Sequence, residues 1–133
     1  MAKIFVICPV RNADESFTRF IHRYVADLEG QGHQVHLPPR DTDQTDPHGI
    51  EICLRNCDAI IAADEVHIWF DPQSTGSHFD RGMLFAMLRL GMPKKVVLIN
   101  TLYRTDHKSF ENVLLALAEG RNIGRSDIKV EVS

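Results

Sequence analysis

The sequence predicts an α/β protein with a doubly wound, flavodoxin-like parallel sheet of four to five strands and helices on both faces. Short, continuously apolar runs of strand length alternate along the chain with longer segments whose apolar residues recur at helical spacing. Continuous apolar runs are typical of strands that are buried on both faces, and the alternation with helices favours a parallel sheet. A length of 133 residues fits a single domain over residues 1–133.

The first third of the chain contains two predicted strands and one predicted helix. The apolar run at residues 3–8 is the first strand, and Pro9 ends it because proline cannot donate a ladder hydrogen bond. Apolar residues then recur at helical spacing over residues 17–28, and Gly30 marks the end of that helix. Residues 34–37 are a short second strand.

The middle of the chain begins with a polar loop that proline interrupts at several points, over residues 38–47. Such a length is unusual in a compact α/β domain, and long loops there are often functional. Pro47 suits the first turn of a helix, which the apolar spacing extends to about Ala62. Residues 66–70 are the third strand, and the next helix is expected over residues 79–90.

The last third adds one clear strand and one clear helix. Residues 95–100 form an apolar run that predicts a fourth buried strand. An amphipathic helix is expected from Phe110 to near Gly120. Residues 128–132 alternate between apolar and charged, which predicts a short fifth or edge strand.

The composition excludes several kinds of partner. The chain is 44% hydrophobic and 25% charged, as is ordinary for a soluble protein, and its net charge of −3 includes no basic stripe. Duplex nucleic acid is therefore not expected as a partner, because its binding requires clustered Lys and Arg. No apolar run approaches the roughly 20 residues that span a bilayer, so no membrane association is expected.

The cysteines and histidines indicate neither a disulfide framework nor a metal site. Three cysteines are an odd number, which favours free thiols in a reducing cytoplasm. No two histidines or cysteines stand at a zinc-ligand spacing that a second pair completes. Cys53 and Cys57 share a face of a predicted helix and are interpreted as small buried hydrophobes. We expect no metal and no cofactor.

The segment 71–82 is the most informative part of the sequence. It is rich in small hydroxyl residues and glycine, and it lies where a parallel strand is followed by a helix. Backbone N–H groups and hydroxyls converge on anions at such places. One carboxylate, Asp80, is expected in the first turn of the helix. The segment therefore predicts a site for a polar ligand that contains a sugar or a phosphate.

The loop at residues 8–12 is expected to lie beside this segment. Ligands of doubly wound sheets bind beyond the carboxyl ends of the strands, where the strand order reverses. Arg11 would then bring a guanidinium to a pocket lined by Ser74, Ser77 and backbone amides, which suits a phosphate. Asp80 suits a sugar hydroxyl or an anomeric carbon.

The pattern Ser74-x-Gly76-x-x-x-Asp80-x-Gly82-x-x-x-Ala86, after a strand preceded by Asp64, resembles a known family. It is similar to the nucleoside 2-deoxyribosyltransferases and the related deoxynucleoside 5′-monophosphate N-glycosidases. The resemblance extends from Lys3 to about Asn100. The substrate-binding residues that it implies are Pro9, Arg11, Asn12, Ser74, Gly76 and Ser77.

The resemblance also implies a mechanism. In that family a glutamate attacks the anomeric carbon, and water or a second base resolves the glycosyl-enzyme. Asp80 occupies the position of this glutamate and is one methylene shorter, which retracts the carboxylate by about 1.5 Å. Asn56 stands where the family has an acid on the preceding helix, and an amide cannot supply a proton at neutral pH. Asp58 is the alternative, but helix geometry turns it roughly 200° away.

Further implications concern the ligand and the assembly. Ser74 stands where phosphate-using relatives place a serine against the 5′-phosphate, which favours a nucleotide over a nucleoside. Family members complete their sites with residues of a neighbouring subunit, so a homo-oligomer is expected.

Structural alternatives remain open for these residues. Asp80 also suits the helix macrodipole, and Ser74 and Ser77 also suit hydrogen bonds within their own turn. Arg11 is also compatible with a plain surface charge, and Asn12 is expected to cap the first helix.

The sequence is compatible with three functions. The first is an enzyme acting at the N-glycosidic bond of a (deoxy)nucleoside or nucleotide, with Asp80 and Asn56 at its centre. The second is a nucleotide-binding or sensing module that has lost its chemistry, and the third is a scaffold that retains only the fold. Arg81 is expected to face away from the site, at the surface or in a subunit contact.

Overall fold

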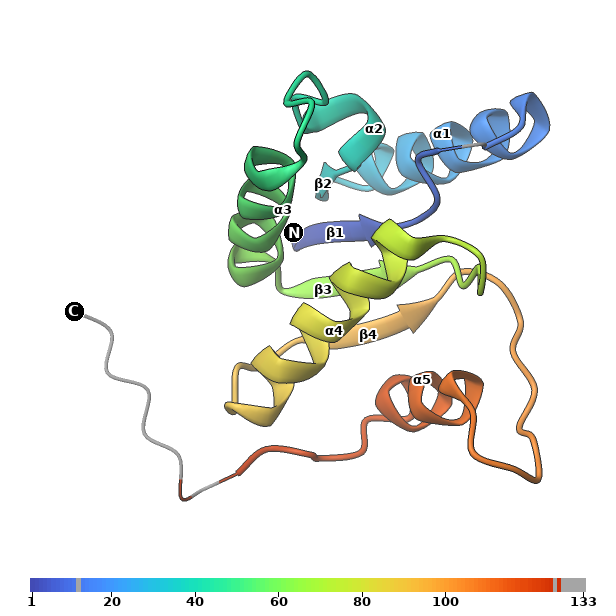
Figure 1. Ribbon diagram of the computed structural model, residues 1–133, viewed down its shortest axis with the longest axis vertical. Coiled ribbons are helices and arrows are strands. Elements are labelled where there is room, and N and C mark those ends of the chain that lie inside the picture. The colour runs from blue at the N-terminus through green and yellow to red at the C-terminus, as the bar shows by residue number, and fades with distance from the viewer. Residues whose placement is uncertain (12, 126, 128–133) are drawn as a thin grey trace.

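The computed structural model describes residues 1–11, 13–125 and 127. Four strands form one parallel sheet in the order β2-β1-β3-β4, which confirms the predicted fold class (Figure 1). Their bounds are β1 Lys3–Ile7, β2 Gln34–His36, β3 Glu65–Ile68 and β4 Lys95–Leu98. The predicted fifth strand at residues 128–132 lies outside the described residues.

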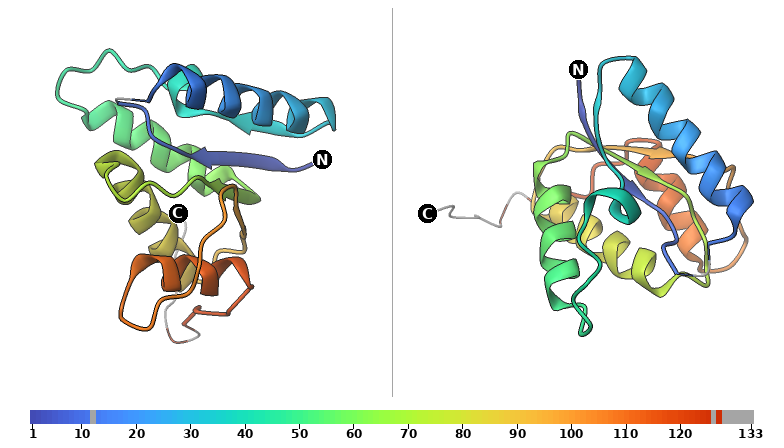
Figure 2. Two further views of the ribbon diagram at one scale, coloured as in Figure 1. Left: turned by 90° about the vertical axis from the view of Figure 1, so that its right-hand side faces the viewer. Right: turned by 90° about the horizontal axis from the view of Figure 1, so that it is seen from above.

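Helices cover both faces of this sheet (Figure 2). Helix α1 (Glu15–Gly30) packs on one face, whereas α3 (Ile50–Ala62) and α4 (Thr75–Arg89) pack on the other. Helix α5 (Phe110–Ala118) lies beside β4, and the short α2 (Pro38–Asp41) follows β2.

The side chains of β1 explain why its sequence is continuously apolar. Ile4 and Val6 belong to the cluster under α1, and Phe5 and Ile7 belong to the cluster under α3 and α4. Alternate residues of a strand point to opposite faces, so a strand covered on both faces has no polar position.

Two helices begin at residues other than those predicted. Helix α4 begins at Thr75 instead of 79, because the Ser74 side chain accepts a hydrogen bond from the Ser77 amide and caps it. Asp80 therefore lies in the second turn and not in the first. Helix α3 begins at Ile50 instead of Pro47, after Gly49 in the left-handed conformation with φ of 81°.

The region before α3 and the start of α1 also differ from the prediction. The expected loop over residues 38–47 begins with the helical turn α2, with Pro38 in its first turn. The N-cap of α1 is Asp14 and not Asn12, since the Asp14 carboxylate accepts from the Phe17 amide at 2.7 Å. Asn12 itself lies outside the described residues.

Candidate functional site

The loops after β1 and β3 begin side by side at the carboxyl edge of the sheet. These two strands are neighbours, and the Trp69 amide extends their pairing by donating to the Ile7 carbonyl at 2.9 Å. The chain crosses from β2 over β1 to β3, so the strand order reverses between β1 and β3. The two loops therefore start from neighbouring strands, as predicted, and ligands of this fold class bind at such a reversal.

Asp80 is a buried carboxylate beside this edge. The residue is 8% exposed, and its carboxylate forms no hydrogen bond with any described residue. Burial raises the pKa of Asp80 to about 6, although the neighbouring Arg81 guanidinium lowers it. Burial is the main cause that raises the pKa values of the Cys8 and Cys57 thiols, and the charge of Asp80 contributes to both, together with Asp58 at Cys57. The carboxylate is therefore near the end of β1 and near α3.

The two predicted serines form the cap of α4. The Ser74 hydroxyl donates to the Ser77 hydroxyl at 2.8 Å and accepts from the Ser77 amide at 3.3 Å. Ser77 is 2% exposed. In the described part of the chain, no partner is found for the amides of Thr75 and Gly76 in the first turn. The structural alternative for the serines is thus realised, while the helix still offers amide donors at its N-terminus.

The remaining predicted binding residues are placed as follows. Pro9 is buried, and Arg11 is exposed in the turn after β1. Gly76 is exposed, and a Cβ at its position would meet no atom within 4 Å, so the fold itself does not require glycine there.

Asn56 lies on the buried face of α3 and ends a short chain of hydrogen bonds. Its Oδ1 accepts from the Thr42 hydroxyl at 2.7 Å, and that hydroxyl lies 2.8 Å from Nε2 of His36. Thr42 and Asn56 are 4% and 7% exposed. Sequence reasoning missed Thr42 and His36. The available signal was weak, a histidine at the end of a strand and a threonine in the polar loop that follows.

Arg81 is not a surface residue, which corrects the prediction. It is 8% exposed, its guanidinium carbon lies 4.7 Å from the centre of the Phe70 ring, and Nη2 donates to Nδ1 of His78 at 3.1 Å. Its Nη1 is buried and has no hydrogen-bond partner within the described chain. The buried face of α4 is wide enough to include both Asp80 and Arg81.

Comparison with known proteins identifies solved structures that have the same fold. No family model matches the sequence, and no curated protein matches it. The CMP N-glycosidase of Clostridium botulinum is 18% identical with a TM-score of 0.55, over 92% of this chain and 85% of that chain. This chain has its fold.

Two 2-deoxyribosyltransferases have the same fold. The enzyme from Leishmania mexicana is 19% identical with a TM-score of 0.55, over 77% of this chain and 67% of that one. The enzyme from Bacillus psychrosaccharolyticus is 17% identical with a TM-score of 0.57, over 85% and 90%. The resemblance seen in the sequence is therefore confirmed at the level of the fold.

Two cavities stand out in the structure, and neither is lined by a predicted site residue. One of 590 Å³ lies between α4 and α5, and one of 370 Å³ lies beside β2 and α3. His36 lines the second. Among the described residues no cluster of three or more His, Cys, Asp or Glu is placed to hold a metal ion, and no helix is long and apolar enough to cross a membrane.

Proposed function

We propose that this chain cleaves or transfers the N-glycosidic bond of a (deoxy)nucleoside or its 5′-monophosphate, with Asp80 as the nucleophile. The observation that carries the proposal is the Asp80 carboxylate, which is 8% exposed and has no hydrogen-bond partner in the described chain. A buried carboxylate with a perturbed pKa at the ligand-binding edge of a fold is a candidate for catalysis. The names of the structural neighbours support this reaction type.

The proposed reaction proceeds in two steps. A pKa of about 6 leaves the Asp80 carboxylate ionised at neutral pH. A carboxylate oxygen forms a bond to the anomeric carbon while the bond from that carbon to the base breaks. The base leaves with the bonding electrons and takes a proton from water, because the amide of Asn56 can donate hydrogen bonds but is not acidic enough to transfer a proton. Water or a second base then displaces Asp80 and loses a proton to solvent. The product is the free sugar or a new nucleoside, which keeps its 5′-phosphate where the substrate carries one.

The ligand would be held by groups at the same edge. The amides of Thr75 and Gly76 and the positive end of α4 suit a 5′-phosphate, and Arg11 would add a guanidinium. Asn56 would contact the base or the sugar. These donors favour a monophosphate over a nucleoside.

Release of free base tests the proposal directly. The purified protein is incubated with the four deoxynucleoside 5′-monophosphates and with their nucleosides, and free base is measured by chromatography. We expect release from at least one of them, a fall in kcat/KM of about tenfold per pH unit below about pH 6, and none from Asp80→Asn. Asp80→Glu measures the effect of the missing methylene. No release by the wild type and by Asp80→Glu contradicts the proposal.

A nucleotide-binding module without turnover is the second candidate. It is favoured by Asn56, which is an amide where the family resemblance places an acid, and by the shorter carboxylate of Asp80. This candidate predicts that a monophosphate raises the melting temperature while no base is released. A scaffold that retains only the fold predicts neither effect.

We also propose that the chain forms a homo-oligomer through the outer faces of α3 and α4, in the cytoplasm. Large apolar side chains recur at helical spacing on α3, and two more are exposed at the start of α4 and at its C-cap, whereas isolated ones are common on any surface. These side chains and their exposed fractions are Ile50 66%, Leu54 53%, Ile61 48%, Phe79 56% and Leu90 38%.

Light scattering after gel filtration tests this part. Leu54→Glu and Phe79→Glu should convert an oligomer into a monomer. Phe85→Glu is the matched control, because Phe85 is also exposed on α4 but lines the cavity toward α5. A monomeric wild type contradicts the proposed oligomer.

A further inference from the structure

We propose that His36 and Thr42 are positioning residues that orient the side-chain amide of Asn56, with its oxygen toward Thr42 and its N–H groups toward the ligand. Asn56 would then bind a ligand atom that has a lone pair. The identity of the ligand rests on the proposed function, whereas the orientation of Asn56 follows from the hydrogen bonds of the protein itself.

The direction of the hydrogen bonds follows from the number of protons available. A threonine hydroxyl has one proton, and here Thr42 donates it to Oδ1 of Asn56 at 2.7 Å. The 2.8 Å contact between Thr42 and Nε2 of His36 then requires that the imidazole donate. The chain runs from His36 Nε2–H to the Thr42 hydroxyl and from there to the Asn56 carbonyl oxygen.

The environment of His36 supports this arrangement. Its ring stacks on Phe5, with ring centres 5.3 Å apart and planes 11° apart, which fixes the ring plane. Burial lowers the pKa of His36, against an opposite effect of Asp41, so the ring is neutral and carries one N–H. The hydrogen bond to Thr42 places that proton on Nε2.

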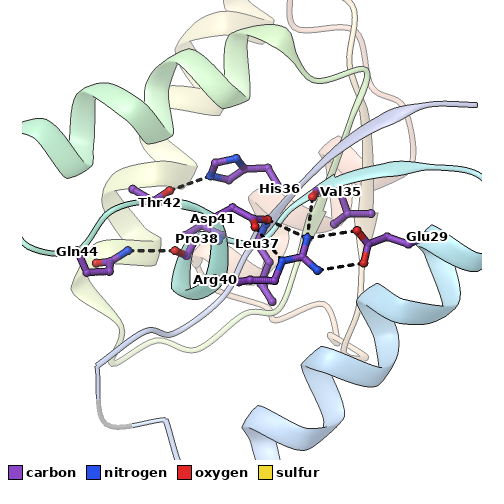
Figure 3. Close-up of polar contacts among 9 residues, drawn as sticks. All are labelled: Glu29, Val35, His36, Leu37, Pro38, Arg40, Asp41, Thr42 and Gln44. Atoms are coloured by element: carbon purple, nitrogen blue, oxygen red, sulfur yellow. Dashed lines mark hydrogen bonds and ion pairs between the residues drawn. The ribbon is translucent and has the colours of Figure 1, made fainter.

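Arg40 connects the segment that carries Thr42 to its neighbours through hydrogen bonds (Figure 3). The guanidinium donates to Glu29 of α1 at 3.0 Å, to the Asp41 carboxylate at 2.8 Å and to the Val35 carbonyl at 3.0 Å. Glu29, Val35 and Asp41 come from α1, β2 and α2, so one side chain ties three elements together. These contacts anchor α2, and Thr42, the next residue, faces α3.

The consequence concerns the free end of the amide. Oδ1 of Asn56 is occupied by Thr42, while Nδ2 has no hydrogen bond to any described residue. Asn56 and Asp80 lie on the buried faces of α3 and α4, and the charge of Asp80 reaches Cys57, the next residue of α3. The free end of the Asn56 amide therefore presents two N–H donors, while Oδ1 faces Thr42. Two donors suit a carbonyl oxygen, a ring nitrogen or a sugar oxygen, and disfavour an amino group.

Nitrogen NMR of the histidine side chains, together with ligand binding, tests the inference. In the wild type we expect His36 as the Nε2–H tautomer. Thr42→Val removes the hydroxyl and keeps the shape, so it should remove the acceptor of the His36 Nε2–H hydrogen bond. Thr42→Ser should preserve that hydrogen bond. Binding of a deoxynucleoside 5′-monophosphate should weaken about tenfold in Thr42→Val, because the amide is free to turn, and stay within about twofold in Thr42→Ser.

The outcomes separate the inference from the proposed function. An Nδ1–H tautomer of His36 would mean that Thr42 donates to His36 and accepts from Asn56, so that Asn56 presents its oxygen, which overturns the inference. Equal binding by folded Thr42→Val and Thr42→Ser also overturns it. A wild type that binds no monophosphate overturns the proposed function, and the tautomer of His36 still decides the orientation of Asn56.

Discussion

The two faces of the sheet bury polar side chains in different ways. On the face covered by α1, His67 is 5% exposed and both of its ring nitrogens have partners. Nδ1 lies 2.6 Å from the Tyr24 hydroxyl, and Nε2 lies 3.0 Å from the Glu65 carboxylate. This network is closed, because the imidazole has no further group to offer.

On the face covered by α3 and α4, three polar groups form no hydrogen bond with any described residue. Nη1 of Arg81 is itself buried, whereas the Asp80 carboxylate and Nδ2 of Asn56 belong to residues that are 8% and 7% exposed. A buried polar group without a hydrogen bond costs about 1–3 kcal/mol, so such groups are expected to be few unless a ligand satisfies them. The comparison separates a face whose buried histidine is fully paired from a face where some polar groups have no partner in the described chain.

Breaking the closed network should have the largest effect on stability. His67→Ala leaves a cavity and removes a partner from both Tyr24 and Glu65, so we expect a loss of about 2–4 kcal/mol in the free energy of unfolding. Urea denaturation at pH 7.5 measures it. His36→Ala is the control on the face covered by α3 and α4. It should lose about 1–2 kcal/mol in the free energy of unfolding, since His36 is less buried and water can replace its ring. Equal losses in the two variants would remove the distinction between the networks.

Removing the charge of Asp80 should have the opposite sign. The pKa of Asp80 rises from 3.8 to about 6 on folding, so the folded state binds its proton more tightly than the unfolded state. Stability is therefore lost as the pH rises between about 4 and 6, and the loss persists above pH 6. Asp80→Asn should stabilise the protein by about 1–3 kcal/mol at pH 8 and by much less at pH 4.

Urea denaturation at the two pH values measures this gain. Asp58→Asn is the matched control, because Asp58 is exposed on α3, and it should change stability by less than about 0.5 kcal/mol. A destabilised Asp80→Asn at pH 8 would mean that the carboxylate is satisfied inside the folded protein.

The sequence predicts the sheet for a simple physical reason. Strands covered on both faces must be apolar at every position, so the four strands are visible as runs in the sequence. The first turn of α4, in contrast, is polar, so a prediction from apolar spacing places the helix start four residues too late. The local signal for the true start is Ser74, a residue type that commonly caps helices.

The rest of the site depends on contacts between segments that are far apart in the sequence. Thr42 and Asn56 are 14 residues apart, and no local pattern indicates that their side chains meet. Arg81 is buried because Phe70 lies under its guanidinium and His78 binds it, next to Phe110 of α5. An isolated arginine on a helix predicts a surface residue, and tertiary packing reverses that expectation.

The smallest expected effect is the pH dependence of the two histidines. Burial lowers the pKa values of His67 and His36 in the folded state, while their ordinary value is 6.5. Between pH 7.5 and 5.5 the unfolded chain therefore binds more protons on these rings than the folded protein, so the rings reduce stability as the pH falls. Asp80 acts in the opposite direction over this range, and a comparison of variants cancels its contribution.

We expect His67→Gln and His36→Gln each to lose less in melting temperature than the wild type between pH 7.5 and 5.5. His67→Gln should show the larger change, because His67 is the more buried. If both variants lose as much as the wild type, the imidazoles are not held neutral on either face, and the difference between the closed and the open network is not electrostatic.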